Sequence, residues 1–169
     1  MYADWNLEDR LQEYFLGENP KFLTALDIGA NDGVYLSNTR QIILDGWNAV
    51  LVDPAESAYK RLKSLYHNHP NVLLCNVGIG KESKKEVFFE SGSYQEDTDD
   101  VALFSSTIES EIQRFPGVTF EKKEIEIMSW SDFLSFYLRP IQISQLYSTT
   151  YTIILDRHPT SIMVPILSP

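Results

Sequence analysis

The chain has 169 residues, of which 43% are hydrophobic, so it has the length and the apolar content of one domain with a sizeable core. Its 24 acidic and 14 basic residues give a formal net charge of −10, which repels nucleic-acid backbones and anionic membrane surfaces. The densest basic clusters are interleaved with or followed by acidic residues, so we expect no nucleic-acid partner.

The cellular setting follows from what the sequence lacks. A single cysteine, Cys75, excludes an internal disulfide, and its apolar neighbours predict a buried strand residue rather than a nucleophile. The amino terminus has neither the basic start nor the apolar run of a secretory signal, and no stretch approaches the ~20 apolar residues that cross a bilayer. We therefore expect a cytoplasmic protein without a membrane span, and we predict no metal site.

The first half of the chain alternates between predicted helices and buried strands. A short amphipathic lead-in helix is predicted from Leu7 to Leu16, followed by an apolar strand from Phe22 to Ile28. A helix from Val34 to Leu44 and a second buried strand from Trp47 to Asp53 complete a strand–helix–strand unit of about thirty residues.

The same alternation continues with a helix from Ala55 to Tyr66 and a third apolar strand from Asn71 to Asn76. Alternation of this kind implies parallel strands that are joined by right-handed crossovers. The predicted fold class is therefore α/β, with a Rossmann-like, mostly parallel sheet, flanking helices and an incomplete carboxyl-terminal part.

The pattern changes after Gly80. Segments Lys85 to Glu90 and Val118 to Ile127 alternate charged and apolar residues, which predicts more exposed strands, antiparallel or at an edge. Between these segments, Gly92 to Asp100 is predicted to be a mobile acidic loop. The last third of the chain has little periodicity, and we place only one further strand there, from Tyr151 to Asp156.

These elements predict a single domain over residues 1–169. It consists of a lead-in helix in residues 1–20, a cofactor-binding core in residues 21–136 and an irregular tail in residues 137–169.

The most informative segment runs from Leu26 to Gly33 and reads Leu-Asp-Ile-Gly-Ala-Asn-Asp-Gly. It lies where the first predicted strand turns into the first helix, at the sheet edge where ligands of such folds bind. Gly29 and Gly33 permit a tight turn and let the backbone approach a ligand closely. Backbone amides at the start of the helix are then expected to bind the carboxylate of the ligand.

The spacing of this segment distinguishes between two classes of cofactor. A dinucleotide loop has the pattern G-x-G-x-x-G, whose second glycine admits a pyrophosphate, but here Asn31 stands in that position. The side chains of Asp27, Asn31 and Asp32 instead suit a ligand with an ammonium group, such as the methionine part of S-adenosylmethionine. The predicted cofactor-binding residues of this segment are Asp27, Gly29, Ala30, Asn31, Asp32 and Gly33.

A second acidic residue, Asp53, ends the second predicted strand about twenty residues beyond Gly33. A carboxylate there can accept hydrogen bonds from the two ribose hydroxyls of a nucleoside. Asn76 and Val77, at the end of the third strand, are expected to border the adenine. Taken alone, a glycine-rich turn is common in α/β proteins, and an acid after a strand also serves as a helix N-cap. The combination, in order, predicts a nucleoside site.

These residues resemble the FkbM family of S-adenosylmethionine-dependent methyltransferases. The resemblance covers roughly residues 23–134 and rests on Leu26 to Gly33, Val52-Asp53-Pro54, Asn76 to Gly80 and Phe104 to Thr107. It implies a Rossmann-like methyltransferase fold and methylation of hydroxyl groups on sugars, lipids or secondary metabolites. It also implies that Asp27, Gly29, Asn31 and Gly33 line the methionine end of the cofactor, and that Asp53 binds the ribose.

The chain departs from the family pattern toward its end. Members usually carry Ile-Asp-x-Glu-Gly on a later strand, whereas the matching place here reads Ile153-Ile154-Leu155-Asp156-Arg157-His158, without the Glu-Gly. A reading-frame change or truncation after about residue 150 is the hypothesis that this departure suggests. It predicts that another frame of the encoding DNA contains the missing motif.

No catalytic residue can be assigned from the sequence. His67 and His69 are interpreted as a solvated helix end, and His158 lies in the tail that departs from the family. Ser105 and Ser106 lie in a family-like segment, but they are interpreted as caps of a helix from Thr107 to Phe115.

The leading hypothesis is an S-adenosylmethionine-dependent O-methyltransferase that acts on a small-molecule, sugar or lipid acceptor. One alternative is a truncated cofactor-binding module without turnover, in which an unfinished sheet edge favours self-association. A second alternative, an NAD-dependent oxidoreductase or epimerase, is opposed by Asn31.

Overall fold

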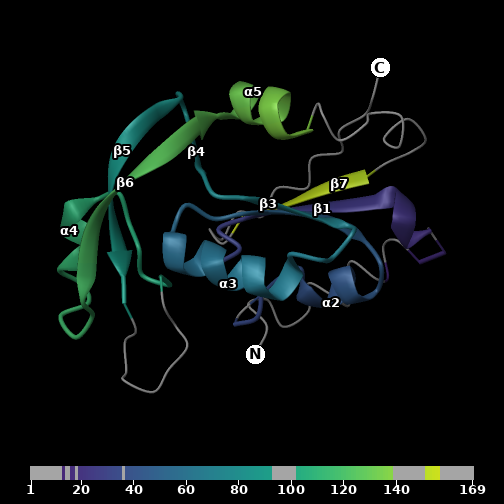
Figure 1. The fold of residues 1–169 in the computed structure, drawn as a ribbon, viewed down its shortest axis with the longest axis horizontal. Helices are drawn as coiled ribbons and strands as arrows, with labels where there is room; N and C mark the ends of the chain where they lie inside the picture. The colour runs from purple at the N-terminus through teal and green to yellow at the C-terminus, as the bar shows by residue number, and fades with distance from the viewer. Residues whose placement is uncertain are drawn as a thin grey trace.

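The structure is a computed structural model that describes residues 19–35, 37–92, 102–138 and 151–156, together with Glu13, Leu16 and Gly17. Within these residues the strands form a four-stranded sheet, sheet A, and a three-stranded sheet, sheet B (Figure 1). Sheet A contains β1 (Leu23–Ile28), β2 (Asn48–Val52), β3 (Val72–Cys75) and β7 (Tyr151–Asp156). Sheet B contains β4 (Gly78–Gly80), β5 (Lys84–Ser91) and β6 (Phe120–Ser129). The helical elements are η1 (Pro20–Phe22), α2 (Arg40–Leu44), α3 (Glu56–Tyr66), α4 (Glu109–Ile112), α5 (Trp130–Phe133) and the π-helical turn η2 (Leu134–Leu138).

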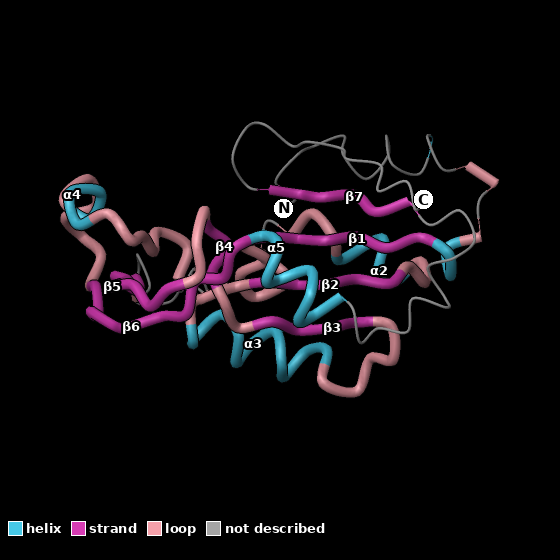
Figure 2. The backbone as a smooth tube through the Cα atoms, turned by 90° about the horizontal axis from the view of Figure 1, so that it is seen from above, coloured by secondary structure: helices cyan, strands magenta, loops and turns pink. Residues whose placement is uncertain are grey.

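Sheet A is parallel throughout and has the order β3-β2-β1-β7 (Figure 2). Its register pairs Asp27 with Leu51 and Ile28 with Val52, so the carboxyl ends of β1 and β2 lie side by side. The three predicted apolar strands and the further strand predicted from Tyr151 to Asp156 are therefore confirmed as strands. The protein has an α/β fold with a parallel sheet.

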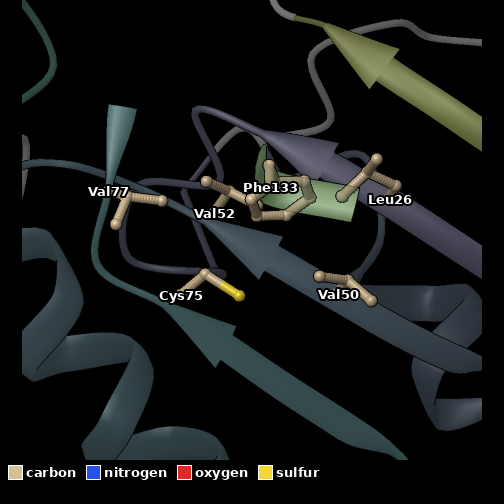
Figure 3. Close-up of a cluster of buried hydrophobic side chains, with 6 residues drawn as sticks. All are labelled: Leu26, Val50, Val52, Cys75, Val77 and Phe133. Carbon is tan, nitrogen blue, oxygen red and sulfur yellow. The ribbon is translucent and has the colours of Figure 1, made fainter. Parts of the chain in front are cut away.

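Helices cover both faces of sheet A (Figure 1). On one face, α2 and α3 contribute Ile43, Leu62 and Tyr66 to a core cluster that also contains Ala49 and Leu51 of β2. On the other face, Phe133 of α5 is fully buried against strand residues (Figure 3). The strand side chains of this second cluster are Leu26, Val50, Val52 and Cys75, with Val77 beyond the end of β3. Burial on both faces explains why these strands are nearly continuous apolar runs.

The prediction of a helix from Val34 to Leu44 is wrong in its extent, because α2 begins only at Arg40. The side chain of Asp32 accepts hydrogen bonds from the amides of Val34 and Tyr35, each at 2.8 Å, and so holds a turn where the helix was expected. Short polar side chains that bind nearby amides in this way compete with helix formation. By contrast, the helix predicted from Ala55 to Tyr66 is confirmed as α3.

Sheet B begins where β4 continues from the carboxyl end of β3, after Asn76 and Val77. β5 and β6 are antiparallel, as the charged alternation predicted. The alternation fails at the end of β5, where four consecutive residues from Phe88 to Ser91 are buried. The predicted helix from Thr107 to Phe115 is shorter than expected, with α4 covering Glu109–Ile112.

Several predictions fall on residues outside the described ones. These are most of the lead-in helix, of which only Glu13, which is helical, and Leu16, which lies in a turn, are described; the acidic loop after Gly92; and the tail apart from residues 137–138 and β7. Among the described residues, no helix has the length and apolar character that crossing a bilayer requires.

Candidate functional site

The candidate site lies at the carboxyl edge of sheet A, where the loop after β1 meets the end of β2. The amide of Asn31 in this loop donates to Oδ2 of Asp53 at 2.8 Å. The amides of Gly29 and Ala30 both donate to the carbonyl of Val52, at 2.8 and 3.1 Å. The structure therefore brings the two predicted acidic positions, Asp27 and Asp53, to the same edge of the sheet, as a common ligand requires.

Asp27 is the buried acid at the end of β1. Asp27 is 2% exposed, and its Oδ2 accepts a hydrogen bond from the Thr39 hydroxyl at 2.8 Å. Thr39, itself buried, precedes α2, so the hydrogen bond links the strand to the start of that helix. The carboxylate is thus oriented by the protein, which is the arrangement that precise binding of a charged ligand requires.

Asn31 has the most unusual environment in the loop. Its backbone has a φ of 51°, in the left-handed region that asparagine tolerates better than most residues. Asn31 is 3% exposed, yet neither Oδ1 nor Nδ2 of its side chain has a hydrogen-bond partner among the described residues. An unsatisfied buried amide is costly, and native structures rarely contain one without a ligand, water or other reason.

Asp32 serves the loop itself. Besides accepting from the amides of Val34 and Tyr35, it lies 3.9 Å from the guanidinium of Arg61 on α3. The expectation that backbone amides at a helix start bind the ligand's carboxylate is therefore wrong at this position. The helix begins farther on, and the amides of Val34 and Tyr35 are already donated to Asp32.

The two glycines of the loop have different roles, and the turn predicted at Gly29 is confirmed. Gly33 has a φ of 73°, and a Cβ there would lie 2.8 Å from Leu62 and 2.9 Å from Tyr66. The close approach at Gly33 is thus to α3 rather than to a ligand. Gly29, with a φ of 79°, forms the turn itself, and Ala30 is buried in the core between the loop and α3.

Asp53 is 7% exposed and joins three segments. Its Oδ2 accepts from Asn31, its Oδ1 accepts from the amide of Ala55 at 2.9 Å, and its carbonyl accepts from Nδ2 of Asn76 at 2.8 Å. The N-cap residue of α3 is Ala55, which has no side-chain cap, so the N-cap role that the sequence left open for Asp53 is not confirmed. The bond to Ala55 instead closes a turn just before the helix.

Asn76 and Val77 follow β3 at the same edge but differ in exposure. Asn76 is exposed and holds the backbone at Asp53, whereas Val77 is 2% exposed and belongs to the core cluster of Figure 3. The side chain of Val77 therefore packs under α5, and a role beside the adenine stays a prediction for both residues.

Sequence reasoning missed a buried ionic contact between sheet B and α3. The carboxylate of Glu90, a residue 5% exposed at the end of β5, accepts from the amides of Glu56 at 3.1 Å and Ser57 at 2.9 Å. Nζ of Lys123 on β6 lies 3.1 Å from Oε2 of Glu90. The broken alternation at Phe88–Phe89–Glu90 was the available signal, since it places an acid among buried residues.

The pKa values of this ion pair reflect two opposing effects. Burial raises the pKa of Glu90, but hydrogen bonding by Ser57 and Lys123 outweighs burial, and the net pKa lies below its ordinary value. For Lys123 the directions are reversed. Burial lowers the pKa of Lys123, but its contacts with Glu90 and Glu121 outweigh burial, and the net pKa lies above its ordinary value. Both groups are charged at neutral pH.

A cleft of about 350 Å³ lies beside this contact, between the start of α3 and sheet B. Charged and polar side chains form most of its wall, namely Glu56, Asn76, Lys85, Glu90, Lys123, Glu124 and Glu126, together with Pro54 and Ile125. Because Pro54 follows Asp53 directly and Asn76 contacts it, the cleft adjoins the predicted cofactor-binding residues.

The remaining candidate residues lie away from the loop. Burial raises the pKa of the Cys75 thiol to about 12, so it is protonated at neutral pH and is no nucleophile. His67 caps the carboxyl end of α3, at the opposite edge of the sheet. Ser105 accepts from the amide of Ser91, and Ser106 accepts from the amide of Ile108 just before α4. The described residues contain no cluster of acidic, histidine or cysteine side chains that could hold a metal ion.

The fold and site together define the class as an α/β protein with a polar loop at the carboxyl edge of a parallel sheet. Comparisons with protein-family models, with curated proteins and with solved structures give no match to this chain.

Proposed function

We propose that this protein is an S-adenosylmethionine-dependent methyltransferase of the FkbM type, with a Rossmann-like fold and a hydroxyl group as methyl acceptor. The strand order β3-β2-β1 supports the proposal, because in such sheets ligands bind beyond the carboxyl ends of the strands, near β1. The loop after β1 and the acid after β2 both lie there and contact each other through Asn31 and Asp53.

The observation that carries the proposal is the buried side-chain amide of Asn31. Its donor and its acceptor both lack partners among the described residues, although the residue is 3% exposed. The carboxylate and ammonium of an amino-acid moiety offer an acceptor and a donor, so the methionine end of the cofactor could satisfy both. In this role Asn31 would be joined by Asp27, whose carboxylate favours the ammonium or the sulfonium.

The hydrogen bonds of the loop favour a sulfonium over a diphosphate. A diphosphate site needs free backbone amides at a helix start, but Asn31, Val34 and Tyr35 donate their amides to carboxylates. Carboxylates around the loop also repel phosphate. An NAD-dependent oxidoreductase or epimerase is therefore a poorer proposal than a methyltransferase.

In the proposed reaction the acceptor oxygen attacks the methyl carbon of the sulfonium in line with the sulfur. The new O–C bond forms as the S–C bond breaks, S-adenosylhomocysteine leaves, and a base or water takes the hydroxyl proton. The protein's contribution would be alignment and exclusion of water, with Asp53 holding the ribose and the loop holding the amino-acid end.

Titration calorimetry with S-adenosylhomocysteine, S-adenosylmethionine and NAD⁺ tests the cofactor. We expect the adenosyl ligands to bind and NAD⁺ not to bind. Asn31→Ala should weaken S-adenosylhomocysteine binding by about tenfold, since two hydrogen bonds are lost. Asn48→Ala is the matched control, because Asn48 bonds the carbonyls of Lys21 and Leu23 at the opposite edge of the sheet. Equal affinities for the two variants would remove Asn31 from the site, and binding of NAD⁺ alone would overturn the proposal.

One observation favours a second candidate, a cofactor-binding module without turnover. Both histidines among the described residues, His67 and His69, follow α3 at the edge of the sheet away from the loop. Hydroxyl methylation benefits from a general base, and histidine is the usual one. S-adenosylhomocysteine binding without methyl transfer to any of a panel of sugar and lipid hydroxyls would favour this candidate over the enzyme.

A further inference from the structure

The contact between Glu90 and α3 joins the two sheets at the helix that carries the candidate site. Glu90 comes from β5 of sheet B, and its two oxygens accept from two consecutive amides in the first turn of α3, those of Glu56 and Ser57. An acidic group at this position also interacts favourably with the helix dipole. Lys123 of β6 lies 3.1 Å from the same carboxylate and compensates its buried charge.

The hydrogen bonds continue from this turn to the loop after β1. The amide of Ala55, the residue before Glu56, donates to Oδ1 of Asp53, and Oδ2 of the same carboxylate accepts from Asn31. The side chains of Asp53 and Glu90 thus bind three consecutive amides at the helix start. A shift of this turn would move the Asp53 carboxylate and with it the Asn31 amide.

We propose that Glu90 is a positioning residue that fixes the first turn of α3 and, through Asp53, the conformation of the loop at Asn31. The inference depends on the proposed function only in naming that loop as the cofactor loop. Glu90 itself contacts neither Asn31 nor Asp53 through any hydrogen bond seen in the described residues, so its effect is indirect.

Amide hydrogen exchange, read by NMR on the full chain without ligand, tests this directly. Glu90→Gln keeps the shape of the side chain but replaces one of its two acceptor oxygens with an NH2 group. That group cannot accept the hydrogen bond from the α3 amide it faces, and the variant also lacks the negative charge that pairs with Lys123. We expect the protection of the Glu56, Ser57 and Asn31 amides to fall about ten- to hundredfold. If Glu56 and Ser57 lose protection and Asn31 does not, Glu90 merely holds sheet B against the helix, and the proposal fails.

Two controls separate this effect from loss of stability. Glu124→Gln removes an exposed acid of β6 that pairs with Lys85, and it should leave all three amides unchanged. Val50→Ala creates a core cavity in β2 and lowers stability, so it should affect amides only through global unfolding. Loss of Asn31 protection in Val50→Ala equal to that in Glu90→Gln would contradict a specific role.

A second pair of variants applies if Glu90→Gln does not fold. Glu56 is the first residue of α3, where proline is well tolerated, and Ala55 before it has the extended backbone that precedes a proline. Glu56→Pro therefore deletes one donor to Glu90, while Glu56→Ala keeps that donor and removes the same side chain. We expect Asn31 protection to be several-fold lower in Glu56→Pro, by about the effect of one hydrogen bond. Equal protection in the two variants would overturn the proposal.

Ligand binding is measured separately, so that the two proposals fail separately. If wild-type protein binds S-adenosylhomocysteine, Glu90→Gln should weaken binding by about tenfold or more. If wild-type protein does not bind it, the proposed function fails, and the exchange data still decide whether Glu90 positions the loop.

Discussion

Sheet A and sheet B are stabilised in different ways. Strands β1, β2 and β3 of sheet A pack on both faces, with Phe133 of α5 on one side and residues of α2 and α3 on the other. Sheet B is exposed along much of β5 and β6, and it is joined to α3 by a small apolar cluster of Ala55, Ala58, Phe88, Ile125 and Ile127 and by the contact between Glu90 and Lys123. Sheet A thus depends mainly on apolar burial, whereas sheet B combines a smaller apolar cluster with specific ionic contacts.

The difference indicates how the candidate site is constructed. Apolar burial is non-directional and fixes sheet A, which brings the ends of β1 and β2 together. Charged hydrogen bonds are directional, and the contact at Glu90 sets the start of α3. We therefore expect changes in sheet A to alter overall stability most, and changes at the junction to act more locally.

The largest effect is expected at Phe133, which is fully buried. Phe133→Ala should lower the free energy of unfolding by about 3–5 kcal/mol, because it leaves a cavity between α5 and sheet A. Phe136, on the next turn and 64% exposed, is the control, and Phe136→Ala should change stability by at most about 0.5 kcal/mol. Urea unfolding measures both, and similar losses in the two variants would show that α5 does not seal sheet A.

A smaller effect is expected at Gly33, where the loop touches α3. Gly33→Ala should destabilise by about 2–4 kcal/mol, because a positive φ disfavours any side chain and the new Cβ would overlap Leu62 and Tyr66. Gly17→Ala isolates the backbone contribution, since Gly17 also has a positive φ but nothing within 4 Å of a Cβ. It should destabilise by about 1–2 kcal/mol. Equal decreases in the thermal unfolding temperature of Gly33→Ala and Gly17→Ala would show that the close approach at Gly33 does not affect stability.

A third comparison lies within sheet B, between two lysines of different exposure. Lys123→Met should lower stability by about 1–2 kcal/mol, because it leaves the buried Glu90 carboxylate without its cation. Lys85 pairs with Glu124 on the exposed face, and Lys85→Met should leave stability within the error of chemical unfolding. Equal losses would show that burial does not distinguish the two pairs.

The smallest effect concerns the pH dependence of the junction. The folded state lowers the pKa of Glu90 from its ordinary value of 4.5, so its contribution to stability is present above about that pH. The contribution is lost as the pH falls through the lower folded pKa, where the carboxylate becomes protonated. The stability difference between wild type and Glu90→Gln, measured by urea unfolding from neutral pH downward, should therefore narrow only in acid. A difference that narrows on going from acid to neutral pH would reverse the sign and contradict the assignment.

Local patterns predicted most of sheet A and the place of the candidate site. Strands β1, β2 and β3 can be predicted from the sequence because burial on both faces makes each of them a nearly continuous apolar run. The glycine that follows β1 predicts the turn at Gly29. The extent of α2 was not predictable from helix periodicity. It depends on Asp32 and Ser37, whose side chains bind the amides of Val34, Tyr35, Thr39 and Arg40.

Roles within the site divide in the same way. Asp27 and Asp53 were placed at one sheet edge by the parallel order alone, since parallel strands share their carboxyl edge. That Gly33 faces α3, and that Glu90 binds the start of α3, depends on contacts between residues about 30 apart in the chain. No local pattern contains that information.

The sequence by itself thus determined the alternation of strands and helices, the parallel sheet and the polar turn after β1, because periodicity and turn chemistry act over a few residues. The tertiary structure alone decided which amides and carboxylates bind one another: Asn31 with Asp53, Asp32 with its own turn, and Glu90 with α3. Hydrogen bonds need atoms within about 3 Å of each other, and only the packed chain brings residues from separate elements that close.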